Sequence, residues 1–390
     1  MSYFHWITGT TLGFAWLYRL IGAARGMPKI PDISSPEWDC NSKDGHHPKV
    51  SIIVPARNED VSIAASLSQL LNLDYDNYEV IAVNDRSNDR TGEIMEQVAA
   101  DRRVNARLKV VHIQQLPHGW LGKAHAMWTA GKAATGEWLL FTDADVLFRP
   151  DSLRRAIAYA EAECADHLVV FPWMIMKTAG EKMMIAFFQT LFIFGHRPWK
   201  VADPKTKDHM GVGAFNLVRR RVYDAIGSYE ALRFEVIDDM KLGKIVKNAG
   251  FAQRNVFGKD LISIRWAFGA MGVVNNLTKN FFAVMSFQWP RAVASAFALG
   301  FLNLMPFLGV WLAHGWARAP YALSLACIFC VYFGMSEKSG IPFYYVFLHP
   351  VSTLLFVYTL LRSTFLTLHQ RGVIWRGTKY PLEALRKGLV

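Results

Sequence analysis

The chain has 390 residues, 52% of them hydrophobic, with a formal net charge of +11 and four cysteines. This length allows one sizeable catalytic domain together with membrane segments. The positive charge is compatible with nucleic acid, acidic lipid headgroups or an anionic substrate; we interpret it as basic residues that flank membrane segments, with no nucleic acid as partner. Cys327 and Cys330 lie in an apolar run without a second pair of ligands nearby, so the pattern indicates neither a zinc site nor a disulfide framework.

The first predicted element is a mostly apolar stretch over Tyr3–Ala24, which has about the length that a bilayer helix needs. A cleavable signal peptide begins with positive charge, and no Lys or Arg precedes Arg19, so we expect residues 1–25 to remain as an N-terminal membrane anchor. The basic residues that follow predict that the chain after this anchor is cytoplasmic. Residues 26–48 are polar, contain prolines and are predicted to form a linker.

Between residues 49 and 260 the pattern changes to short β-rich runs that alternate with stretches of helical length and period. This alternation predicts an α/β domain with a mainly parallel sheet flanked by helices, in which ligands bind beyond the carboxyl ends of the strands. The expected strands are Val50–Pro55, Tyr78–Asn84, Leu108–Ile113, Trp138–Asp143 and Leu168–Trp173. The expected helices are Val61–Leu71, Gly92–Arg102, Ala124–Ala134 and Ser152–Glu163.

Long apolar runs dominate the remainder of the chain. Met183–Phe194 is too short to span a bilayer, and Phe268–Phe287, within residues 261–289, carries polar side chains, so both are predicted to be interfacial helices, with core helices of the catalytic domain as the alternative. Residues 290–368 are predicted to hold transmembrane segments, and residues 369–390 a basic cytoplasmic tail. The runs in question are Val293–Ala313, Tyr321–Met335 and Pro342–Leu361. Three spans would place the tail outside, so either one run is re-entrant or interfacial or the positive-inside rule fails here.

The strongest chemical signal is Asp143-Ala144-Asp145, which directly follows an apolar strand. Two carboxylates separated by one residue at a strand end can face one hard cation, and Mg²⁺ or Mn²⁺ held in this way completes its shell with substrate phosphates. An isolated Asp-x-Asp is common and caps helices or faces solvent in most proteins. Its position at a strand end predicts a metal and diphosphate site.

Two further polar segments close the first two strands. Pro55-Ala56-Arg57-Asn58-Glu59 follows the first strand, and Asn84-Asp85-Arg86-Ser87-Asn88-Asp89 closes the second. Each alone reads equally well as an ordinary polar turn. Together with the acidic pair they bring hydrogen-bonding groups to one sheet edge, where a nucleotide base and ribose could be bound.

The fourth signal is the pair Asp238-Asp239, which precedes an amphipathic helix. Carboxylates at this position satisfy free amides and favour the helix dipole, which accounts for one of the two. The other is available as a base. Sugar transfer with inversion needs one carboxylate that takes the acceptor proton while a metal stabilises the diphosphate leaving group.

In this order the four elements resemble family-two glycosyltransferases with the GT-A nucleotide-diphospho-sugar transferase fold, and the resemblance covers about Val50 to Phe287. It implies that Asp143 and Asp145 bind metal and diphosphate, that Asp239 is the catalytic base, and that Asp238, where the family usually has Glu, lies on the acceptor side. It also assigns nucleotide or donor contacts and an acceptor-side glycine loop. The donor contacts are Pro55, Glu59, Asp85 and Lys123, and the glycines are Gly211 and Gly213.

Arg265-Trp266 resembles the end of the Gln-x-x-Arg-Trp element of processive synthases and of the related element in ceramide glucosyltransferases. Ile262 stands where that element has Gln or Arg. The departure argues against a processive polymer synthase and leaves Arg265 as a donor diphosphate contact and Trp266 as an acceptor-side residue.

As a whole the chain resembles bacterial lipid-directed members of the family, including those associated with hopanoid and carotenoid glycosylation. The resemblance implies a multi-pass protein of the bacterial cell membrane whose cytoplasmic catalytic domain transfers a sugar, preferably from a UDP-linked donor, to a lipid acceptor. Three alternative classes of protein make different demands on the sequence. A nucleotide-binding oxidoreductase would need a Gly-x-Gly-x-x-Gly turn after the first strand, which is absent from the sequence. A processive polysaccharide synthase shares the fold and base, and a non-catalytic scaffold would not need the three aspartates.

Overall fold

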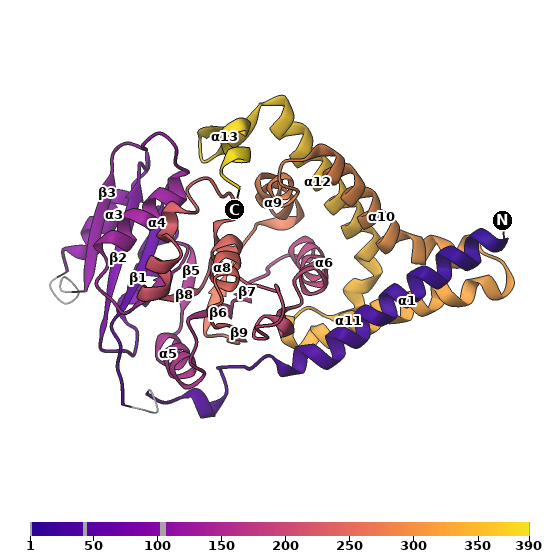
Figure 1. The fold of residues 1–390 in the computed structure, drawn as a ribbon, viewed down its shortest axis with the longest axis horizontal. Coiled ribbons are helices and arrows are strands. Elements are labelled where there is room, and N and C mark those ends of the chain that lie inside the picture. Colours follow the sequence, from indigo (N-terminus) through magenta and orange to yellow (C-terminus); the bar gives the residue numbers. More distant parts are fainter. Residues whose placement is uncertain (1, 42–44, 102–106, 390) are drawn as a thin grey trace. The chain divides into compact units, whose positions relative to one another are not determined.

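The computed structural model describes residues 2–41, 45–101 and 107–389, which fall into two compact units (Figure 1). The sheet unit comprises Ile30–Ile175, Pro198–Arg265 and Glu383–Val390. The helical unit comprises Met1–Lys29, Met176–Arg197 and Trp266–Leu382. The chain therefore passes between the two units several times.

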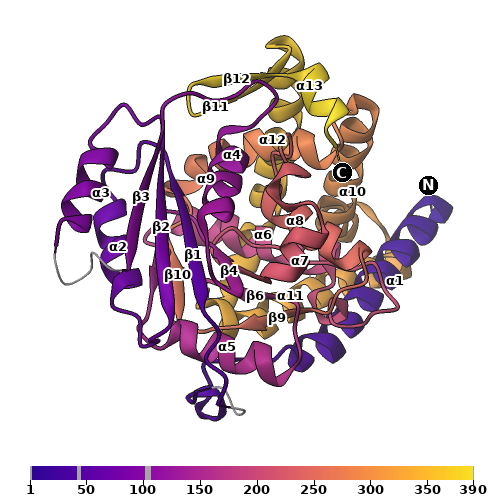
Figure 2. The same ribbon diagram turned by 60° about the vertical axis from the view of Figure 1, so that its left-hand side comes forward.

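Within the described residues the main sheet of the sheet unit has seven strands in the order β3-β2-β1-β4-β8-β6-β9 (Figure 2). Only β8 runs antiparallel to its neighbours, so the predicted α/β architecture with a mainly parallel sheet is confirmed. The strands are β1 (Val50–Ala56), β2 (Tyr78–Asp85), β3 (Leu108–Ile113), β4 (Trp138–Phe141), β6 (His167–Phe171), β8 (Asn216–Arg219) and β9 (Gln253–Phe257).

The helices that follow the first strands form where the periodicity predicts them, with ends shifted by a few residues. They are α2 (Ile63–Leu71), α3 (Thr91–Ala99), α4 (Gly122–Ala133) and α5 (Ser152–Ala162). Arg102, the predicted end of the second helix, lies outside the described residues. One expected strand, Leu168–Trp173, is divided at Pro172, which has no N–H for the ladder. The part after this proline, β7 (Trp173–Met174), pairs instead with β10 (Ile262–Ile264), which also pairs with β5 (Val146–Phe148).

The central strands are apolar on both faces because helices cover both faces of the sheet. Ile52 and Val54 on β1 and Leu140 on β4 are completely buried, and each contributes about 1.5–3 kcal/mol by leaving water. Parallel strands buried in this way read as continuous hydrophobic runs in the sequence. Their carboxyl ends meet at one edge of the sheet, where the polar segments follow.

Part of the predicted linker packs onto the sheet unit. Ile33 and Trp38 are buried in the core of that unit, and the amide of Ile33 donates to the carbonyl of Phe257. The buried guanidinium of Arg155 donates to the carbonyl oxygens of Ile33 and Ser35 at 3.2 and 2.8 Å. The middle of this predicted linker, residues 42–44, lies outside the described residues.

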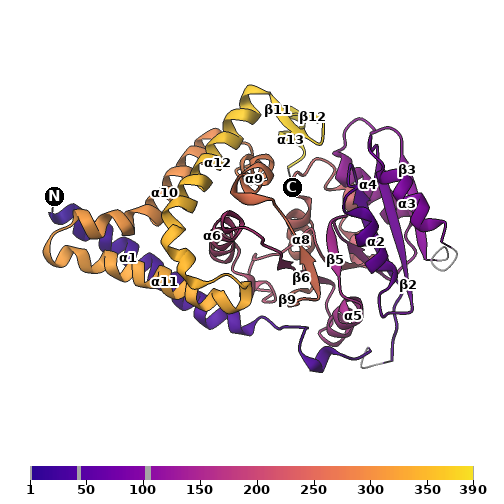
Figure 3. The same ribbon diagram turned by 180° about the vertical axis from the view of Figure 1, so that it is seen from behind.

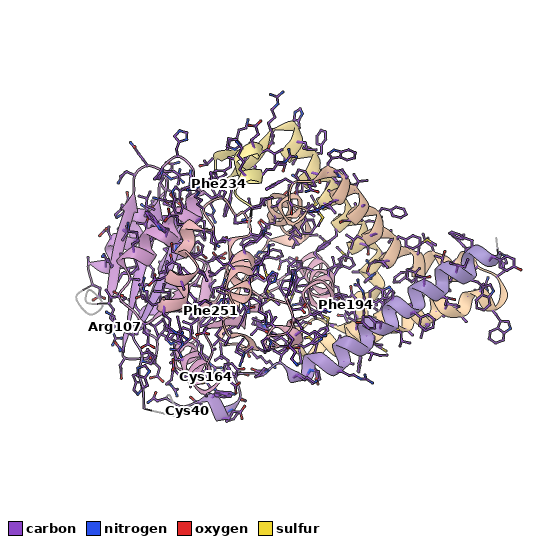
Figure 4. The ribbon with its side chains drawn as sticks, in the orientation of Figure 1. Cys40, Arg107, Cys164, Phe194, Phe234 and Phe251 are labelled. Carbon is purple, nitrogen blue, oxygen red and sulfur yellow. The ribbon has the colours of Figure 1, made fainter. Side chains whose placement is uncertain are left out.

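At the other end of the chain, residues Glu383–Val390 belong to the sheet unit. They include all of α13 (Leu382–Lys387) except its first residue. The backbone of Gly388 packs on Phe234, and a Cβ atom at Gly388 would lie 2.4 Å from the Cβ of Phe234. Figure 4 labels Phe234. Phe234 precedes the predicted Asp238-Asp239 pair by four residues, so the C-terminal segment supports the loop that leads to it.

The helical unit contains long helices, and α1 packs along α11 and also contacts α10 (Figures 1 and 3). Trp16 of α1 donates its indole N–H to the carbonyl of Leu302 on α10 at 3.0 Å. The helices are α1 (Ser2–Gly26), α6 (Ala179–His196), α9 (Gly269–Val284), α10 (Trp289–Leu312), α11 (Ala319–Ser339) and α12 (His349–His369).

Three C-terminal segments of the described chain are long and apolar enough to cross a membrane, by length and composition: Trp289–Leu312, Gly315–Ser339 and Phe343–His369. They coincide with the apolar runs expected within residues 290–368. The predicted anchor at residues 1–25 forms one helix, α1, with large exposed apolar side chains such as Ile7 and Phe14. Its insertion in a membrane stays a prediction.

The last long helix, α12, buries hydroxyl side chains and exposes apolar ones. The hydroxyl of Ser363 accepts from the amide of Phe282 on α9 at 3.0 Å, and Ser352 donates to the carbonyl of Met183 on α6 at 3.2 Å. Leu354 and Phe365 are more than half exposed on the outer side. Small polar residues toward the protein and apolar residues outward are typical of a helix whose outer side faces lipid.

The starts of α6 and α9 are joined by one carboxylate. Thr178 and Glu181 form a capping box at the N-terminus of α6. The fully buried Glu181 carboxylate also accepts from the amide of Gly269, at the start of α9, at 2.9 Å. These two helices are the segments for which an interfacial position is predicted from sequence.

Candidate active site

The edge at the carboxyl end of β4 carries the predicted metal pair. Asp143 comes two residues after the last residue of β4, and its amide donates to the carbonyl of Gly213 at 3.0 Å. Ala144 is buried, whereas Asp143 and Asp145 on either side of it are partly exposed. The two carboxylates therefore stand on either side of a buried residue in the turn that joins β4 to β5 (Val146–Phe148).

Lys123 at the start of α4 connects the acidic groups. Its Nζ lies 2.7 Å from Asp143 Oδ1 and 3.6 Å from Asp238 Oδ1. Burial alone would lower the pKa of Lys123, but the charges of Asp143, Asp238 and Asp239 outweigh it and raise that pKa above its ordinary value. The ammonium is therefore charged at neutral pH and compensates the cluster of carboxylates.

The acidic pair occupies the first turn of α8 (Asp238–Asn248). The two oxygens of Asp239 accept from the amides of Gly213 and Met240 at 2.9 and 2.8 Å, which fixes the carboxylate. Burial raises the pKa of Asp239, against the opposing effect of the Lys123 charge. Asp238 is more deeply buried, and the hydroxyl of Tyr229 donates to it at 3.4 Å. The two adjacent carboxylates thus have different environments.

The glycine loop is required by close approach. A Cβ at Gly211 would lie 1.8 Å from the carbonyl oxygen of Asp239, and one at Gly213 would lie 2.5 Å from Asp143 Oδ2. No side chain fits at either distance. The loop backbone therefore joins the metal pair to the predicted base, which the sequence placed 96 residues apart along the chain, from 143 to 239.

The ends of β1 and β2 carry the predicted nucleotide contacts. Pro55 is the half-buried penultimate residue of β1, and the amide of Glu59 donates to the hydroxyl of Thr91 at 2.8 Å. Asp85, the last residue of β2, is 4% exposed. Its carboxylate accepts two hydrogen bonds from Arg86, at 2.7 and 3.0 Å. Since β1 lies between β2 and β4, Asp85 and Asp143 flank the same edge from either side.

Arg265 and Trp266 lie at the division between the units. The antiparallel register of β10 with β5 pairs Ile264 with Val146, the residues next in the chain to Arg265 and Asp145. Trp266 belongs to the helical unit, where Phe188 packs on its ring at 5.1 Å between centroids. Arg265 thus belongs to the same unit as the acidic groups and directly follows the strand that pairs with β5.

Sequence reasoning missed a buried network that holds the glycine loop. The side-chain amide of Gln253 accepts from the amide of Met210 at 2.9 Å and donates to the carbonyls of Met210 and Gly243. It also donates to His167 Nδ1 at 2.7 Å, and His167 Nε2 bonds to Asn216 Oδ1 at 2.9 Å. Burial lowers the pKa of His167 to about 4. No motif in the sequence marks these three residues, since their contacts join β6, β8 and β9.

The donor set at Asp143 and Asp145 fits a divalent cation. Two partly exposed carboxylates in one turn are oxygen ligands of the kind Mg²⁺ and Mn²⁺ take, and the absence of a side chain at Gly213 leaves room beside Asp143. Elsewhere among the described residues, His46, Glu137 and Glu161 also lie close enough to share a cation. Arg219 already bonds both of these glutamates, at 3.0 and 2.9 Å, so we interpret that group as an ion-pair network.

A mainly parallel sheet whose carboxyl edge gathers carboxylates, a lysine and a glycine loop is the arrangement expected of a GT-A glycosyltransferase. Residues 51–227 match the family model described as Glycosyl transferase family 2. This segment is therefore a family-two glycosyltransferase domain, and the protein is a glycosyltransferase that uses a nucleotide sugar.

Known proteins resemble more of the chain than this domain. The chain is 23% identical to a 4,4'-diaponeurosporenoate glycosyltransferase of Staphylococcus aureus (strain MRSA252), over 87% of this chain and 90% of that protein. A protein of the same name from Staphylococcus haemolyticus (strain JCSC1435) is 23% identical over 59% of this chain, and the match spans 60% of that relative. The solved structure of mannosyltransferase PcManGT from Pyrobaculum calidifontis, in complex with GDP-Man and Mn²⁺, has a TM-score of 0.56 and 19% sequence identity, and covers 94% of this chain and 99% of that one. This likeness confirms the GT-A fold.

Proposed function

We propose that the protein transfers a sugar from a nucleotide-diphosphate donor to a lipid acceptor, with inversion at the anomeric carbon and with a divalent metal as cofactor. The observation that carries the proposal is the convergence of Asp143, Asp238 and Asp239 around the Lys123 ammonium. Lys123 Nζ lies 2.7 Å from Asp143 and 3.6 Å from Asp238, and the Gly213 amide donates to Asp239 at 2.9 Å. One edge thus holds both a site for anionic phosphates and a fixed carboxylate.

Asp143 and Asp145 would hold the Mg²⁺ or Mn²⁺ ion, which would neutralise the donor diphosphate as it leaves. Lys123 and Arg265 would add positive charge beside the same diphosphate, while Pro55, Glu59 and Asp85 would bind the nucleoside. We place the acceptor next to the glycine loop, with Asp238 on its side. For Trp266, an acceptor-side role rests on the family resemblance alone.

Asp239 would take the proton of the acceptor hydroxyl as that hydroxyl attacks the anomeric carbon from the face opposite the diphosphate. Its raised pKa suits this role, because a carboxylate with a pKa closer to the working pH is the stronger base. Hydrogen bonds from Gly213 and Met240 orient the carboxylate before the acceptor arrives. A single attack of this kind, assisted by one base, inverts the configuration at the anomeric carbon of the transferred sugar.

A lipid acceptor is supported by the apolar helices and by the relatives. Three C-terminal helices are long and apolar enough to cross a membrane, and the relatives are named for the acceptor 4,4'-diaponeurosporenoate. We therefore propose a carotenoid-like or other long apolar acceptor that reaches a cytoplasmic catalytic site from the bacterial membrane. A UDP-linked donor is preferred on family resemblance, and the mannosyltransferase structure, which holds GDP-Man, makes GDP-linked donors the first comparison.

The orientation of the tail leads us to propose that α12 lies at the membrane interface. Its hydroxyl-rich face contacts α6 and α9, which are predicted to be interfacial, and Arg362 on it donates to Asn275 and Thr278 of α9 at 2.9 and 3.0 Å. With α1, α10 and α11 as spans and α12 at the cytoplasmic surface, the basic tail remains in the cytoplasm, as the positive-inside rule requires.

The direct test is nucleoside-diphosphate release by the purified full-length protein in detergent, across UDP- and GDP-linked sugars, with and without host lipid extract. We expect lipid-stimulated release from one donor. Asp239→Asn should lower kcat by about 10²–10⁴-fold, the usual contribution of a general base. Asp260→Asn, which changes an exposed aspartate of the sheet unit, is the matched control and should retain full activity.

The product distinguishes this reaction from the processive alternative. A single glycolipid with inverted configuration supports the proposal, whereas a ladder of oligosaccharides would indicate a polysaccharide synthase. Retention of configuration would contradict the single-base scheme. Equal and absent turnover in wild type and Asp239→Asn with every donor and with lipid extract would support the scaffold reading.

Membrane orientation can be tested with a native thiol. Cys164, after α5 in the sheet unit, is exposed (Figure 4). A membrane-impermeant maleimide should label it in inverted membrane vesicles and not in intact cells. The Cys164→Ser variant is the control: any labelling that it retains comes from the three other cysteines. Labelling in intact cells would contradict the cytoplasmic orientation of the catalytic domain.

A further inference from the structure

The β-hairpin at the end of α12 has one buried face and one exposed face (Figure 3). Its strands are β11 (Gly372–Trp375) and β12 (Thr378–Pro381). The antiparallel register pairs Val373 with Tyr380, and both residues are buried. It also pairs Ile374 with Lys379, and both are exposed, Ile374 by 52%. Because paired residues share a face and successive residues alternate, the first pair packs against the protein and the second faces outward.

The hairpin is held by two helices of the helical unit. Strand β11 contacts α12 and α9. Lys279 of α9 lies over the ring of Trp375, with its Nζ 4.4 Å from the ring centroid, which is a cation–π contact. Tryptophan is enriched at the boundary between lipid headgroups and hydrocarbon. The hairpin is thus fixed to the two helices for which we expect an interfacial position.

The outer side of the hairpin is basic and carries one large apolar side chain. Arg371, Arg376 and Lys379 are exposed in the hairpin and directly before it. Residues 338–382 contain no Asp or Glu, so no acidic neighbour in this part of the sequence offsets these charges. Ile374 is the exposed partner of Lys379 in the ladder. Exposed apolar side chains next to several Lys and Arg residues are typical of elements that bind anionic lipid surfaces.

An apolar helix face leads to this basic end. Leu361, Phe365 and Leu368 in the last turns of α12 are exposed, and their spacing of four and three residues places them on one face of the helix. The chain then enters the hairpin with Ile374 exposed. An apolar face that ends in basic residues matches the hydrocarbon and the headgroups of a membrane in that order.

We infer that the hairpin docks on the negatively charged headgroups of phospholipids at the cytoplasmic membrane surface, with Ile374 in contact with lipid. The inference rests on the proposed function for the position of α12 at that surface, and it assigns a lipid contact distinct from the acceptor. After the hairpin the chain continues into Glu383–Val390, where Gly388 packs on Phe234. Docking would therefore anchor the segment that supports the loop leading to Asp238-Asp239.

The test measures hydrogen exchange of the amides of residues 372–381 in the full-length protein in lipid nanodiscs. One set of nanodiscs contains phosphatidylcholine alone, and the other contains phosphatidylcholine mixed with phosphatidylglycerol. Lys379→Glu reverses a charge of the hairpin, and Lys379→Arg keeps it. Lys109→Glu reverses an exposed lysine of β3 and is the matched control. Nucleoside-diphosphate release is measured on the same nanodiscs.

We expect phosphatidylglycerol to slow exchange in the wild-type hairpin. Lys379→Glu should lose about fivefold of this protection or more, the contribution of one basic residue near an anionic surface. Lys379→Arg and Lys109→Glu should keep it. In phosphatidylcholine alone Lys379→Glu should exchange as wild type, because the exposed lysine does not hold the hairpin together.

Equal exchange of the wild-type hairpin in the two lipids would overturn the inference, and so would protection that persists in Lys379→Glu. Protection by inorganic phosphate in phosphatidylcholine nanodiscs would also overturn it, because the hairpin would then bind a free anion. Faster exchange of Lys379→Glu in phosphatidylcholine alone would assign the lysine to the fold instead. Lipid protection without nucleoside-diphosphate release from any donor would refute the proposed catalysis and leave the docking inference standing.

Discussion

The buried histidine beneath the glycine loop predicts a specific pH dependence of stability. His167 is fully buried, and its pKa is lowered from 6.5 to about 4. In the folded state the ring is neutral above pH 4, whereas in the unfolded state it takes up a proton below about pH 6.5. The unfolded state therefore binds more protons in this interval, and the free energy of unfolding falls as the pH is lowered from 6.5 to 4.

The size of the effect follows from the shift. Each pKa unit corresponds to about 1.4 kcal/mol, so the full interval is worth about 3 kcal/mol. Protonation of Nδ1 would place an N–H against the side-chain NH₂ of Gln253, which donates to that atom at 2.7 Å. Rotation of the Gln253 amide would relieve this contact but would remove its bond from the Met210 amide. Acid should therefore loosen the glycine loop first.

The assay is thermal unfolding of the full-length protein in detergent between pH 7 and 4.5, together with hydrogen exchange of the Met210 amide. We expect a falling midpoint and faster exchange, beyond the intrinsic pH effect, in wild type. His167→Gln should start less stable at pH 7 and show a smaller decrease on acidification. His118→Gln, which changes an exposed histidine, should behave as wild type. Parallel pH curves for wild type and His167→Gln would refute the reasoning.

Three further outcomes concern the acidic edge. Lys123→Met should raise the donor KM about 10–100-fold, because a hydrogen bond to a charged group is lost, and Lys123→Arg should restore part of it; unchanged KM would show that the ammonium does not meet the diphosphate. Gly213→Ala, whose Cβ would lie 2.5 Å from Asp143 Oδ2, should lose about 1–3 kcal/mol of stability and most activity. Gly195→Ala, with no atom within 4 Å of the added Cβ, is its control. A chelator should abolish turnover and Mn²⁺ or Mg²⁺ should restore it, while Asp145→Asn should need about tenfold more metal; chelator-resistant turnover would contradict metal dependence.

Much of the sheet unit could be predicted because its signals are local. The strands around Ile52 and Leu140 are buried on both faces, so they appear as apolar runs that end in polar turns. The strand that was predicted through Pro172 is the instructive exception. Proline stops the ladder there, and the following residues join a different sheet. Strand β8 was missed because it is short and its position between β4 and β6 depends on partners distant in sequence.

The residues of the candidate site likewise comprise some that sequence motifs predict and others that only tertiary contacts reveal. Asp143, Asp145, Asp238 and Asp239 stand out because short acidic motifs at element ends have a recognisable chemistry. Gln253, by contrast, acquires its role only from contacts with three other elements. No periodicity or motif encodes such a contact in advance.

The sequence by itself determined the alternation of strands and helices, the apolar C-terminal runs, and the acidic and glycine motifs that resemble the family, because each depends on neighbouring residues. The tertiary structure decided which of these motifs meet. It brought Lys123 between Asp143 and Asp238, and it fixed Asp239 on the Gly213 amide. These contacts form because the parallel strands end at one edge of the sheet. Which strands lie next to one another depends on the packing of the whole chain, which the spacing of motifs in the sequence does not specify.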